Sequence, residues 1–348
     1  MEMALTYRNL IELFYQSLAK VTRGDKICVE VIRADRHETL TFAQLRAGAE
    51  VFATSLLVES GLSRGDKIAL VSRNRADWDI AFWGIVLAGM IPVLIDPERG
   101  PQGVISHMQA TDSRCLILAD DYTEEEARRE LADFCDAQQL RILILVGTPL
   151  SDLDSPNHDA LDAVRLQTDS QDTAVILCTS GTTGDPREVE LTHANLIANL
   201  QGSIRKVDLT EADVLGHILP PHHSFGMTVG KLLALAAGAT NVYTNKYREV
   251  ADLIRDRRIT IFIAIPALYT TLAKKLEDGI EKQKKQSRLV ALLDRFAPGC
   301  VGRRLRRKLG WTNVRFFLSG AAPMPRWVLE SLWRRGFKMF EGYGTTEN

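Results

Sequence analysis

Short apolar segments alternate with helical segments along most of this 348-residue chain, and no other feature of the sequence constrains the fold as strongly. The first clear unit runs from a strand at 67–71 through a helix at 75–88 to a strand at 91–95. Both strands are almost entirely apolar, which is typical of a parallel sheet covered by helices on both faces. The pattern therefore predicts an α/β fold with mostly parallel sheets.

The same alternation continues to the end of the chain. We expect further strands at 115–118, 140–146, 173–178, 214–219, 241–244, 259–265 and 314–318. We expect further helices at 7–21, 41–61, 101–110, 123–138, 194–204, 226–237, 250–257, 267–276 and 325–334. The helix that begins near Thr41 has Gln44 three residues later, which is the pattern of a capping box. The polar segment 151–171 interrupts the alternation, and we expect a surface loop there.

Charge and cysteine content narrow the class of protein. The 43 basic and 44 acidic residues give a net charge of −1, which argues against a nucleic-acid partner. The five cysteines form no CxxC pair and are typical of reduced thiols, so we expect a cytoplasmic protein. The longest uncharged run, 80–95, is shorter than the roughly 20 residues that a membrane span needs.

A basic stretch near the C-terminal end allows two interpretations. Lysines and arginines are dense between Lys274 and Lys308. A solvated helix face is the simpler interpretation. The alternative is a peripheral contact of Lys282–Lys308 with an anionic membrane, because several leucines lie among these basic residues.

A segment rich in hydroxyls and glycines, Thr179–Pro186, follows the strand predicted at 173–178. Gly181 and Gly184 allow a tight turn that brings backbone N–H groups near an anion, and the hydroxyls add donors. Residues 188–191 alternate between polar and apolar, which predicts a second strand. A Walker A loop needs a lysine and a following helix, so that class is excluded. A hairpin turn without a ligand remains the alternative to a phosphate loop.

Four segments of the chain, in this order, resemble the signatures of the adenylate-forming enzymes. They are Thr179–Pro186, Leu219–Gly226, Ser319–Pro323 and Glu341–Glu347, and the similarity extends from about Leu40 to Asn348. This family includes acyl-CoA synthetases, aryl-CoA ligases, luciferases and the adenylation domains of peptide synthetases. Its members use ATP to convert a carboxylic acid to an acyl-adenylate with release of pyrophosphate, and a thiol then takes the acyl group.

The resemblance implies an α/β fold of two packed αβα layers with the ATP site at their junction. One subdomain, 61–205, would carry the phosphate loop, and the other, 1–60 plus 206–348, would carry the acyl, adenine and magnesium motifs. Family members continue past the magnesium motif with a ribose-binding Asp, a hinge and a small lid domain that supplies a catalytic Lys. Because the sequence ends at Asn348, we expect 1–348 to be an incomplete AMP-binding large domain without the lid.

The resemblance also implies a role for each motif residue, including a contact of His223 with the acyl carbonyl and of Glu347 with Mg²⁺. The β- and γ-phosphates would be held by Thr179, Ser180, Gly181, Thr182, Thr183 and Gly184, with Arg187 contributing a positive charge. Tyr343 and Gly344 would lie at the adenine, and Thr346 would bind the α-phosphate. The wall between adenine and acyl group would be formed by Gly320, Ala321 and Ala322.

The sequence departs from the family at 187–188, where Arg187-Glu188 replaces the usual Lys-Gly. The stretch 259–269 and the basic segment after it resemble the long-chain fatty-acyl branch. The expected substrates are therefore a fatty or other carboxylic acid, ATP with Mg²⁺, and coenzyme A or a carrier-protein thiol. The alternative is a non-catalytic nucleotide- or acyl-binding paralogue, or a fragment, that lacks the C-terminal lysine.

Overall fold

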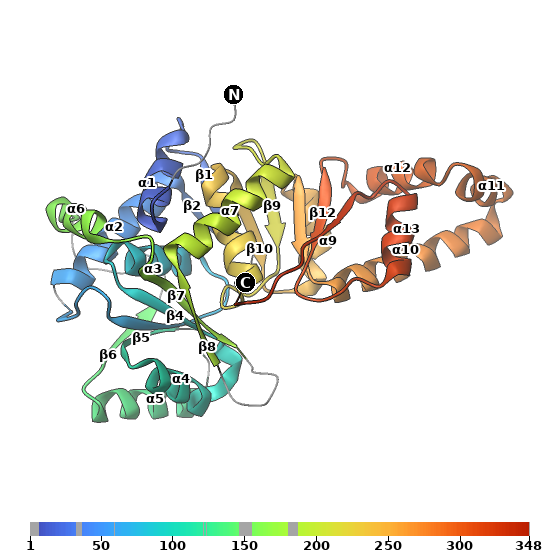
Figure 1. Ribbon diagram of the computed structural model, residues 1–348. Coiled ribbons are helices and arrows are strands. Elements are labelled where there is room, and N and C mark those ends of the chain that lie inside the picture. Colours follow the sequence, from blue (N-terminus) through green and yellow to red (C-terminus); the bar gives the residue numbers. More distant parts are fainter. Residues whose placement is uncertain are drawn as a thin grey trace.

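The structure is a computed structural model that describes residues 7–32, 37–58, 60–120, 122, 124–145, 155–179 and 187–347. Figure 1 shows two sheets with packed helices and an arm of helices that projects to one side. The α/β architecture predicted from the alternation of strands and helices is confirmed.

The two sheets are mostly parallel. The seven-stranded sheet has the order β13-β12-β11-β9-β10-β1-β2, and the six-stranded sheet has the order β6-β5-β3-β4-β7-β8. The strands of the first are β1 (Ile27–Ile32), β2 (His37–Thr41), β9 (Val214–His217), β10 (Thr240–Thr244), β11 (Ile261–Ala264), β12 (Phe316–Ser319) and β13 (Met339–Glu341). The strands of the second are β3 (Lys67–Val71), β4 (Ile91–Ile95), β5 (Ser113–Ala119), β6 (Arg141–Leu145), β7 (Thr173–Thr179) and β8 (Arg187–Thr192). Only the β1–β2 and β7–β8 pairs are antiparallel among the pairings described.

The helices cover both faces of each sheet. They are α1 (Leu10–Lys20), α2 (Phe42–Val58), α3 (Ala76–Leu87), α4 (Gly100–Thr111), α5 (Glu125–Ala137), α6 (His158–Gln167), α7 (His193–Val207), α8 (Leu233–Ala237), α9 (Val250–Asp256), α10 (Pro266–Gln286), α11 (Arg288–Phe296), α12 (Pro298–Leu309) and α13 (Arg326–Arg334). A π-helical turn, Gly226–Leu232, leads into α8. The predicted capping box of α2 is confirmed: the backbone amide of Thr41 donates to Gln44 Oε1 (2.9 Å) and that of Gln44 to Thr41 Oγ1 (3.1 Å).

Alternating strand residues divide the interior into three apolar clusters. In β3, Ile68 and Leu70 face the space between the two sheets, whereas Ala69 and Val71 face α4 and α5. In β11, Ile261 belongs to the central cluster, and the alternate positions pack against α9, α10 and α13. Because successive strand residues point to opposite faces, strands with two covered faces are apolar throughout.

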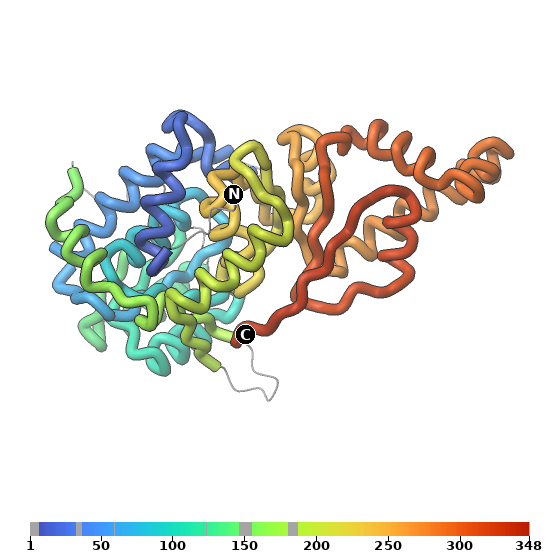
Figure 2. Tube along the Cα trace, turned by 45° about the horizontal axis from the view of Figure 1, so that its top comes forward, coloured from blue at the N-terminus to red at the C-terminus, as the bar shows by residue number. Residues whose placement is uncertain are grey.

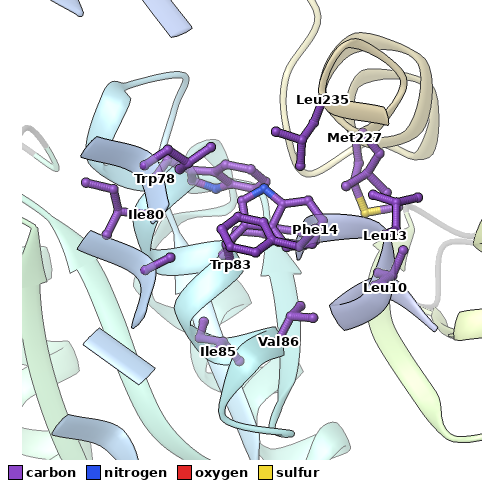
Figure 3. Packing of buried hydrophobic residues seen from close by; sticks show 14 of the residues in the cluster. Leu10, Leu13, Phe14, Trp78, Ile80, Trp83, Ile85, Val86, Met227 and Leu235 are labelled. Atoms are coloured by element: carbon purple, nitrogen blue, oxygen red, sulfur yellow. The ribbon is translucent and has the colours of Figure 1, made fainter. Parts of the chain in front are cut away.

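Helix α3 lies at the centre of the molecule, and all twelve of its residues are buried. Figure 3 shows Trp78 and Trp83 of this helix among side chains of α1 and of the segment around α8. The ring centroids of Phe14 and Trp83 are 4.8 Å apart. One continuous core therefore joins the two sheets.

Several elements differ from the sequence prediction, among them α11 and α12, which the sequence did not predict. The expected loop at 151–171 is wrong for 158–167, which form α6. Asn157 caps this helix by accepting from the Ala160 amide (3.1 Å), and Leu161 and Val164 are buried, so two apolar side chains one turn apart outweigh the polar composition. Strands β1, β2 and β13 were not predicted.

An arm of three helices, α10, α11 and α12, extends from the seven-stranded sheet. In Figures 1 and 2, α10 runs outward, α11 lies at the far end and α12 returns. The sequence predicted only the first half of α10 as a helix. We refer to residues 266–309 as the arm and to the rest of the described chain as the body.

Candidate functional site

Three of the four signature segments begin where neighbouring parallel strands end. Leu219–Gly226 follows β9, Ser319–Pro323 begins at the last residue of β12, and Glu341–Glu347 begins at the last residue of β13. These strands lie in the order β13-β12-β11-β9, so their carboxyl ends share one edge of the sheet. Ligands of open α/β sheets bind at this edge.

The three segments contact one another directly. The Gly342 amide donates to the Ser319 carbonyl (2.7 Å), and Glu341 Oε1 accepts from the Met324 amide (2.8 Å). A Cβ at Gly320 would lie 2.8 Å from the ring of Phe225, so a glycine is required for this close approach. The fold therefore brings the segments around 225, 320 and 342 together although they are distant in sequence.

Loops at the carboxyl edge of the six-stranded sheet contact these signature segments. After β3, the side-chain amide of Asn74 donates to the Leu219 carbonyl (2.8 Å), and the Asn74 carbonyl accepts from the Asn245 side chain (2.9 Å). After β4, Asp96 Oδ1 lies 3.6 Å from His222 Nε2. The carboxyl edges of both sheets thus meet at one junction.

The two neighbouring histidines have different environments. His222 is buried, whereas His223 is exposed, and their ring centroids are 4.5 Å apart. Burial lowers the pKa of His222 to about 4, against the opposing charge of Asp96, so this ring is neutral at neutral pH. His223, which the resemblance places at the acyl carbonyl, lies at the surface of the junction.

The phosphate-loop residues are described only at their two ends. Thr179 ends β7 and pairs with Arg187, the first residue of β8, and Thr179 Oγ1 donates to the Arg187 carbonyl (3.3 Å). Ser180, Gly181, Thr182, Thr183 and Gly184 lie outside the described residues, as do 185–186. The structure has a strand after this segment, as the sequence predicted, and a Walker A loop remains excluded.

The unusual Glu188 has a partner. Its Oε1 lies 2.9 Å from Nδ1 of His107, a buried residue of α4. This carboxylate is therefore held against α4. Arg187 is exposed beside it, so the positive charge is available to a ligand.

The residues that the resemblance assigns to adenine, α-phosphate and Mg²⁺ lie on the last described segment. In Figures 1 and 2 this segment runs from β13 back towards the β7–β8 hairpin. Tyr343 is 97% exposed, Gly344 and Glu347 are exposed, and Thr346 is half-buried. Ala321 and Ala322 are also exposed, and Ala321 has a φ of 68°, which is rare for a residue other than glycine and typical of functional loops.

Three buried polar atoms at the junction have no hydrogen-bond partner among the described residues: Ser319 Oγ, Asn74 Oδ1 and His222 Nδ1. A ligand with hydroxyl, amide or phosphate groups could satisfy such atoms. The unpartnered atoms belong to a hydroxyl, an amide carbonyl and an imidazole, so they offer both donors and an acceptor, which fits a nucleotide. No cluster of three or more His, Cys, Asp or Glu residues suited to a metal occurs within the described ranges, so a metal would need further ligands such as phosphate oxygens.

The sequence analysis did not single out Asn74 or Asp96, and it named Ser319 only as the first residue of a signature segment. Asn74 and Asp96 follow predicted strands, and polar residues at the carboxyl ends of parallel strands are the signal that could have identified them. Beside them lies a cavity of about 260 Å³ at the ends of β3, β4 and β5, lined among others by Arg73, Glu98 and Gly100. No described residue of the four signature segments lines this cavity.

Two mostly parallel sheets whose carboxyl edges meet at one junction, with three signature segments gathered there, define an α/β protein of the class that binds ligands at strand ends. The chain belongs to the AMP-binding enzyme family, which its residues 16–348 match. Its fold is that of the N-terminal domain of adenylate-forming enzymes.

Relatives with known activities support the same family. The long-chain-fatty-acid–CoA ligase of Escherichia coli O6:H1 is 24% identical over 98% of this chain and 61% of its own length. The 4-coumarate–CoA ligase 2 of Petroselinum crispum is 25% identical over 96% of this chain and 56% of its own length. The structure of ATP-bound MatB from Rhodopseudomonas palustris has a TM-score of 0.74 at 22% identity, covering 96% of this chain and 60% of MatB.

Proposed function

We propose that this chain forms the nucleotide-binding part of an acid–CoA ligase that activates a carboxylic acid with ATP. In the first step a carboxylate oxygen bonds to the α-phosphorus of ATP, the bond from this phosphorus to the bridging oxygen breaks, and pyrophosphate leaves. In the second step the sulfur of coenzyme A, or of a carrier-protein thiol, bonds to the acyl carbon and AMP leaves. The chain spans about three-fifths of the length of the curated relatives named above, so the activity of the whole protein is part of the proposal.

One observation carries the proposal. The segments around Phe225, Gly320 and Gly342 contact one another at the sheet edge, and the last of them runs towards the β7–β8 hairpin that bears the phosphate-loop sequence (Figures 1 and 2). Each segment belongs to a different signature of the family. Their meeting point provides unpartnered polar atoms from both sheets, which suits a ligand that extends across the junction.

Each part of the junction would have a separate task. Thr179, Arg187 and the loop between them would hold the β- and γ-phosphates, because hydroxyls and a guanidinium bind phosphate oxygens. Tyr343 would lie against the adenine and Thr346 at the α-phosphate. Mg²⁺ held by Glu347 and the phosphates would offset negative charge as the carboxylate approaches. The neutral His222 and His223 would border the acyl carbonyl.

We propose a fatty acid as the acid substrate. The long-chain ligase among the relatives and the fatty-acyl character of the segment 259–269 support this choice. The 4-coumarate ligase matches at a similar identity, so a planar aromatic acid is the competing substrate.

Nucleotide binding is tested most directly by calorimetry with MgATP. The T182A/T183A double variant removes two hydroxyls of the phosphate loop and should weaken binding about tenfold or more. T271A is the matched control, since Thr271 is an exposed residue of α10 whose hydroxyl, among the described residues, bonds only to the Ala267 carbonyl of its own helix (3.0 Å). Unchanged affinity in the double variant would remove the phosphate loop from the proposal.

Activation is tested by pyrophosphate release with fatty acids of several lengths, 4-coumarate and malonate. The polypeptide 1–348 should release pyrophosphate slowly, because the resemblance assigns one cation of the transfer step to a lysine of the lid. Loss of one preorganised partner of this kind typically costs about 10²–10³ in rate. A polypeptide that continues past Asn348 should therefore be faster. Nucleotide binding without acid-dependent pyrophosphate release in both polypeptides would favour the non-catalytic alternative.

A further inference from the structure

The arm holds α11 in one fixed orientation. Arg335, which follows α13 and is 4% exposed, binds Glu277 of α10 (Nη1···Oε1 2.6 Å) and Asp294 of α11 (Nη2···Oδ1 3.2 Å). Lys284 of α10 also binds Asp294 (2.7 Å). The Ser287 hydroxyl accepts from the Val290 amide and caps α11 where the chain turns the corner (3.4 Å). Ion pairs therefore join α11 to α10 and to the residue after α13, and Ser287 caps its first turn.

These contacts place the acidic side chain of α11 on its inner face. Asp294 is the only residue of this helix that is buried, at 2% exposure. The side chains of Leu289, Leu292 and Phe296 are spaced three and four residues apart, so they share one face of the helix. Their exposed fractions are 64%, 57% and 71%. Helix α11, which carries this row, lies at the far end of the arm (Figures 1 and 2).

Basic residues surround the apolar row. The segment 282–308 contains ten lysines and arginines and one acidic residue, in a chain whose net charge is −1. Lys285, Arg288 and Arg295 flank α11 or belong to it, and all three are exposed. Within the described residues none of these three forms an ion pair, whereas Lys284 does.

We propose that the tip of the arm docks onto an anionic membrane surface, with Leu289, Leu292 and Phe296 entering the headgroup region. A helix with an apolar row and flanking cations is the arrangement that lies in the interface of an anionic bilayer. The exposed basic residues favour an anionic membrane over an uncharged one. The exposed apolar row favours a membrane over a soluble polyanion, which would not bind apolar side chains. No helix in the described part of the chain is long and apolar enough to cross a membrane, so the contact is peripheral.

Co-sedimentation with vesicles tests the proposal, using the whole chain at low salt. Vesicles of phosphatidylcholine alone are compared with vesicles in which about a quarter of the lipid is phosphatidylglycerol. The chain should sediment with the second kind and much less with the first, and added salt should release it. The K285Q/R288Q/R295Q variant should bind more weakly by roughly fivefold for each charge removed.

The apolar row is tested separately with the L292S/F296S variant, which should also lose binding. The matched controls are L166S, since Leu166 of α6 is 72% exposed in the body, and R129Q/R205Q/K206Q, which removes three exposed body cations. Both controls should bind as the unchanged chain does. Thermal unfolding of every variant should remain unchanged, because all these side chains are exposed.

Several outcomes would overturn the proposal. Equal binding to both kinds of vesicle, or binding to neither, would contradict docking of the arm onto an anionic membrane. Loss of binding in the charge variant with full binding in L292S/F296S would assign the tip to a soluble polyanion instead. A dimer in solution that L292S/F296S dissociates would assign the apolar row to a second copy of the chain. The readout is lipid binding, so failure here leaves the proposed ligase activity untouched.

Discussion

Helix α3 and helix α11 are the two extremes of burial in this molecule. All twelve residues of α3 are buried between the two sheets, whereas α11 buries only Asp294. The apolar side chains of α3 surround the helix, as expected for an element enclosed by other elements, while those of α11 form one exposed row. The body is therefore stabilised mainly by a shared apolar core, whereas the arm depends on a few ion pairs that join α10, α11 and Arg335.

The two regions should respond differently to acid, and this is the largest effect we expect. Burial lowers the pKa of His193 from 6.5 to about 4 and that of His217 to about 3, and His222 behaves like His193. The unfolded chain takes up these protons near pH 6.5 and the folded body only near pH 4, so the free energy of unfolding falls as the pH drops from about 6.5 towards 4. Each histidine contributes up to about 2 kcal/mol between pH 6.5 and 5.

The stability of the arm should not change over this pH range. Burial alone would raise the pKa of Asp294, but the hydrogen bond from Lys284 and the charge of Arg335 outweigh it, and the pKa lies below its usual value. Denaturant titrations at pH 7 and 5 measure the loss in the body, and amide exchange of 266–309 reports on the arm. H193Q should reduce the pH slope, and H158Q, at an exposed histidine of α6, should not. A pH slope that is the same in H193Q and the unchanged chain would contradict this assignment.

The buried ion pair of the body gives the next largest effect. Lys231 Nζ lies 2.9 Å from Asp79 Oδ2 and 3.9 Å from the ring centroid of Tyr243, which also donates to Asp79. K231M leaves the Asp79 carboxylate buried without its cation and should lower the free energy of unfolding by about 3–5 kcal/mol.

The matched control is K206M, which replaces an exposed lysine of α7. It should change the stability by less than about 0.5 kcal/mol. Denaturant unfolding measures both variants. If K231M lowers the free energy of unfolding by no more than K206M does, the Lys231–Asp79 pair does not stabilise the body.

The ion pairs that join Arg335 to the arm should contribute less to stability than the Lys231–Asp79 pair, and their loss should affect mainly the arm. R335M removes the cation that joins Glu277 and Asp294. Glu277 is one-third exposed, so water relieves part of the penalty, and we expect a loss of about 2–3 kcal/mol. Amide exchange should accelerate in 266–309 and remain slow in the sheets.

R326M is the control for this variant. Arg326 and Glu330 form an ion pair that is 90% and 63% exposed, and exposed pairs contribute about 0–1 kcal/mol. Exchange that accelerates equally in the body and in the arm of R335M would show that the two regions unfold together.

The smallest effect concerns two glycines of α12. A Cβ at Gly302 would lie 1.7 Å from the carbonyl oxygen of Arg335, whereas Gly299 has open space around it. G302A should therefore displace the arm and destabilise it by about 1–3 kcal/mol, and G299A should stabilise it by up to about 1 kcal/mol through helix propensity. Thermal unfolding measures both variants. If both substitutions change the stability in the same direction, the packing of α12 on Arg335 would be contradicted.

Much of the fold could be predicted from local pattern. The apolar runs predicted five strands of the six-stranded sheet, and the polar–apolar alternation at 188–191 predicted β8. The capping box at Thr41 predicted the start of α2. Strand β13, only three residues long, and the helix α6 were missed. Both form because distant residues cover them: β13 pairs with β12, and the buried Leu161 and Val164 hold α6 against the body.

The sequence by itself determined the class of architecture and the identity of the four signature segments, since both depend on the order of residues along the chain. Only the tertiary structure decided that Phe225 packs on Gly320, that His222 rather than His223 is buried near Asp96, and that Asp294 turns the apolar row of α11 outward. These features depend on which distant segments meet. Burial, hydrogen bonding and charge pairing between such segments follow from packing in three dimensions, which no local pattern records.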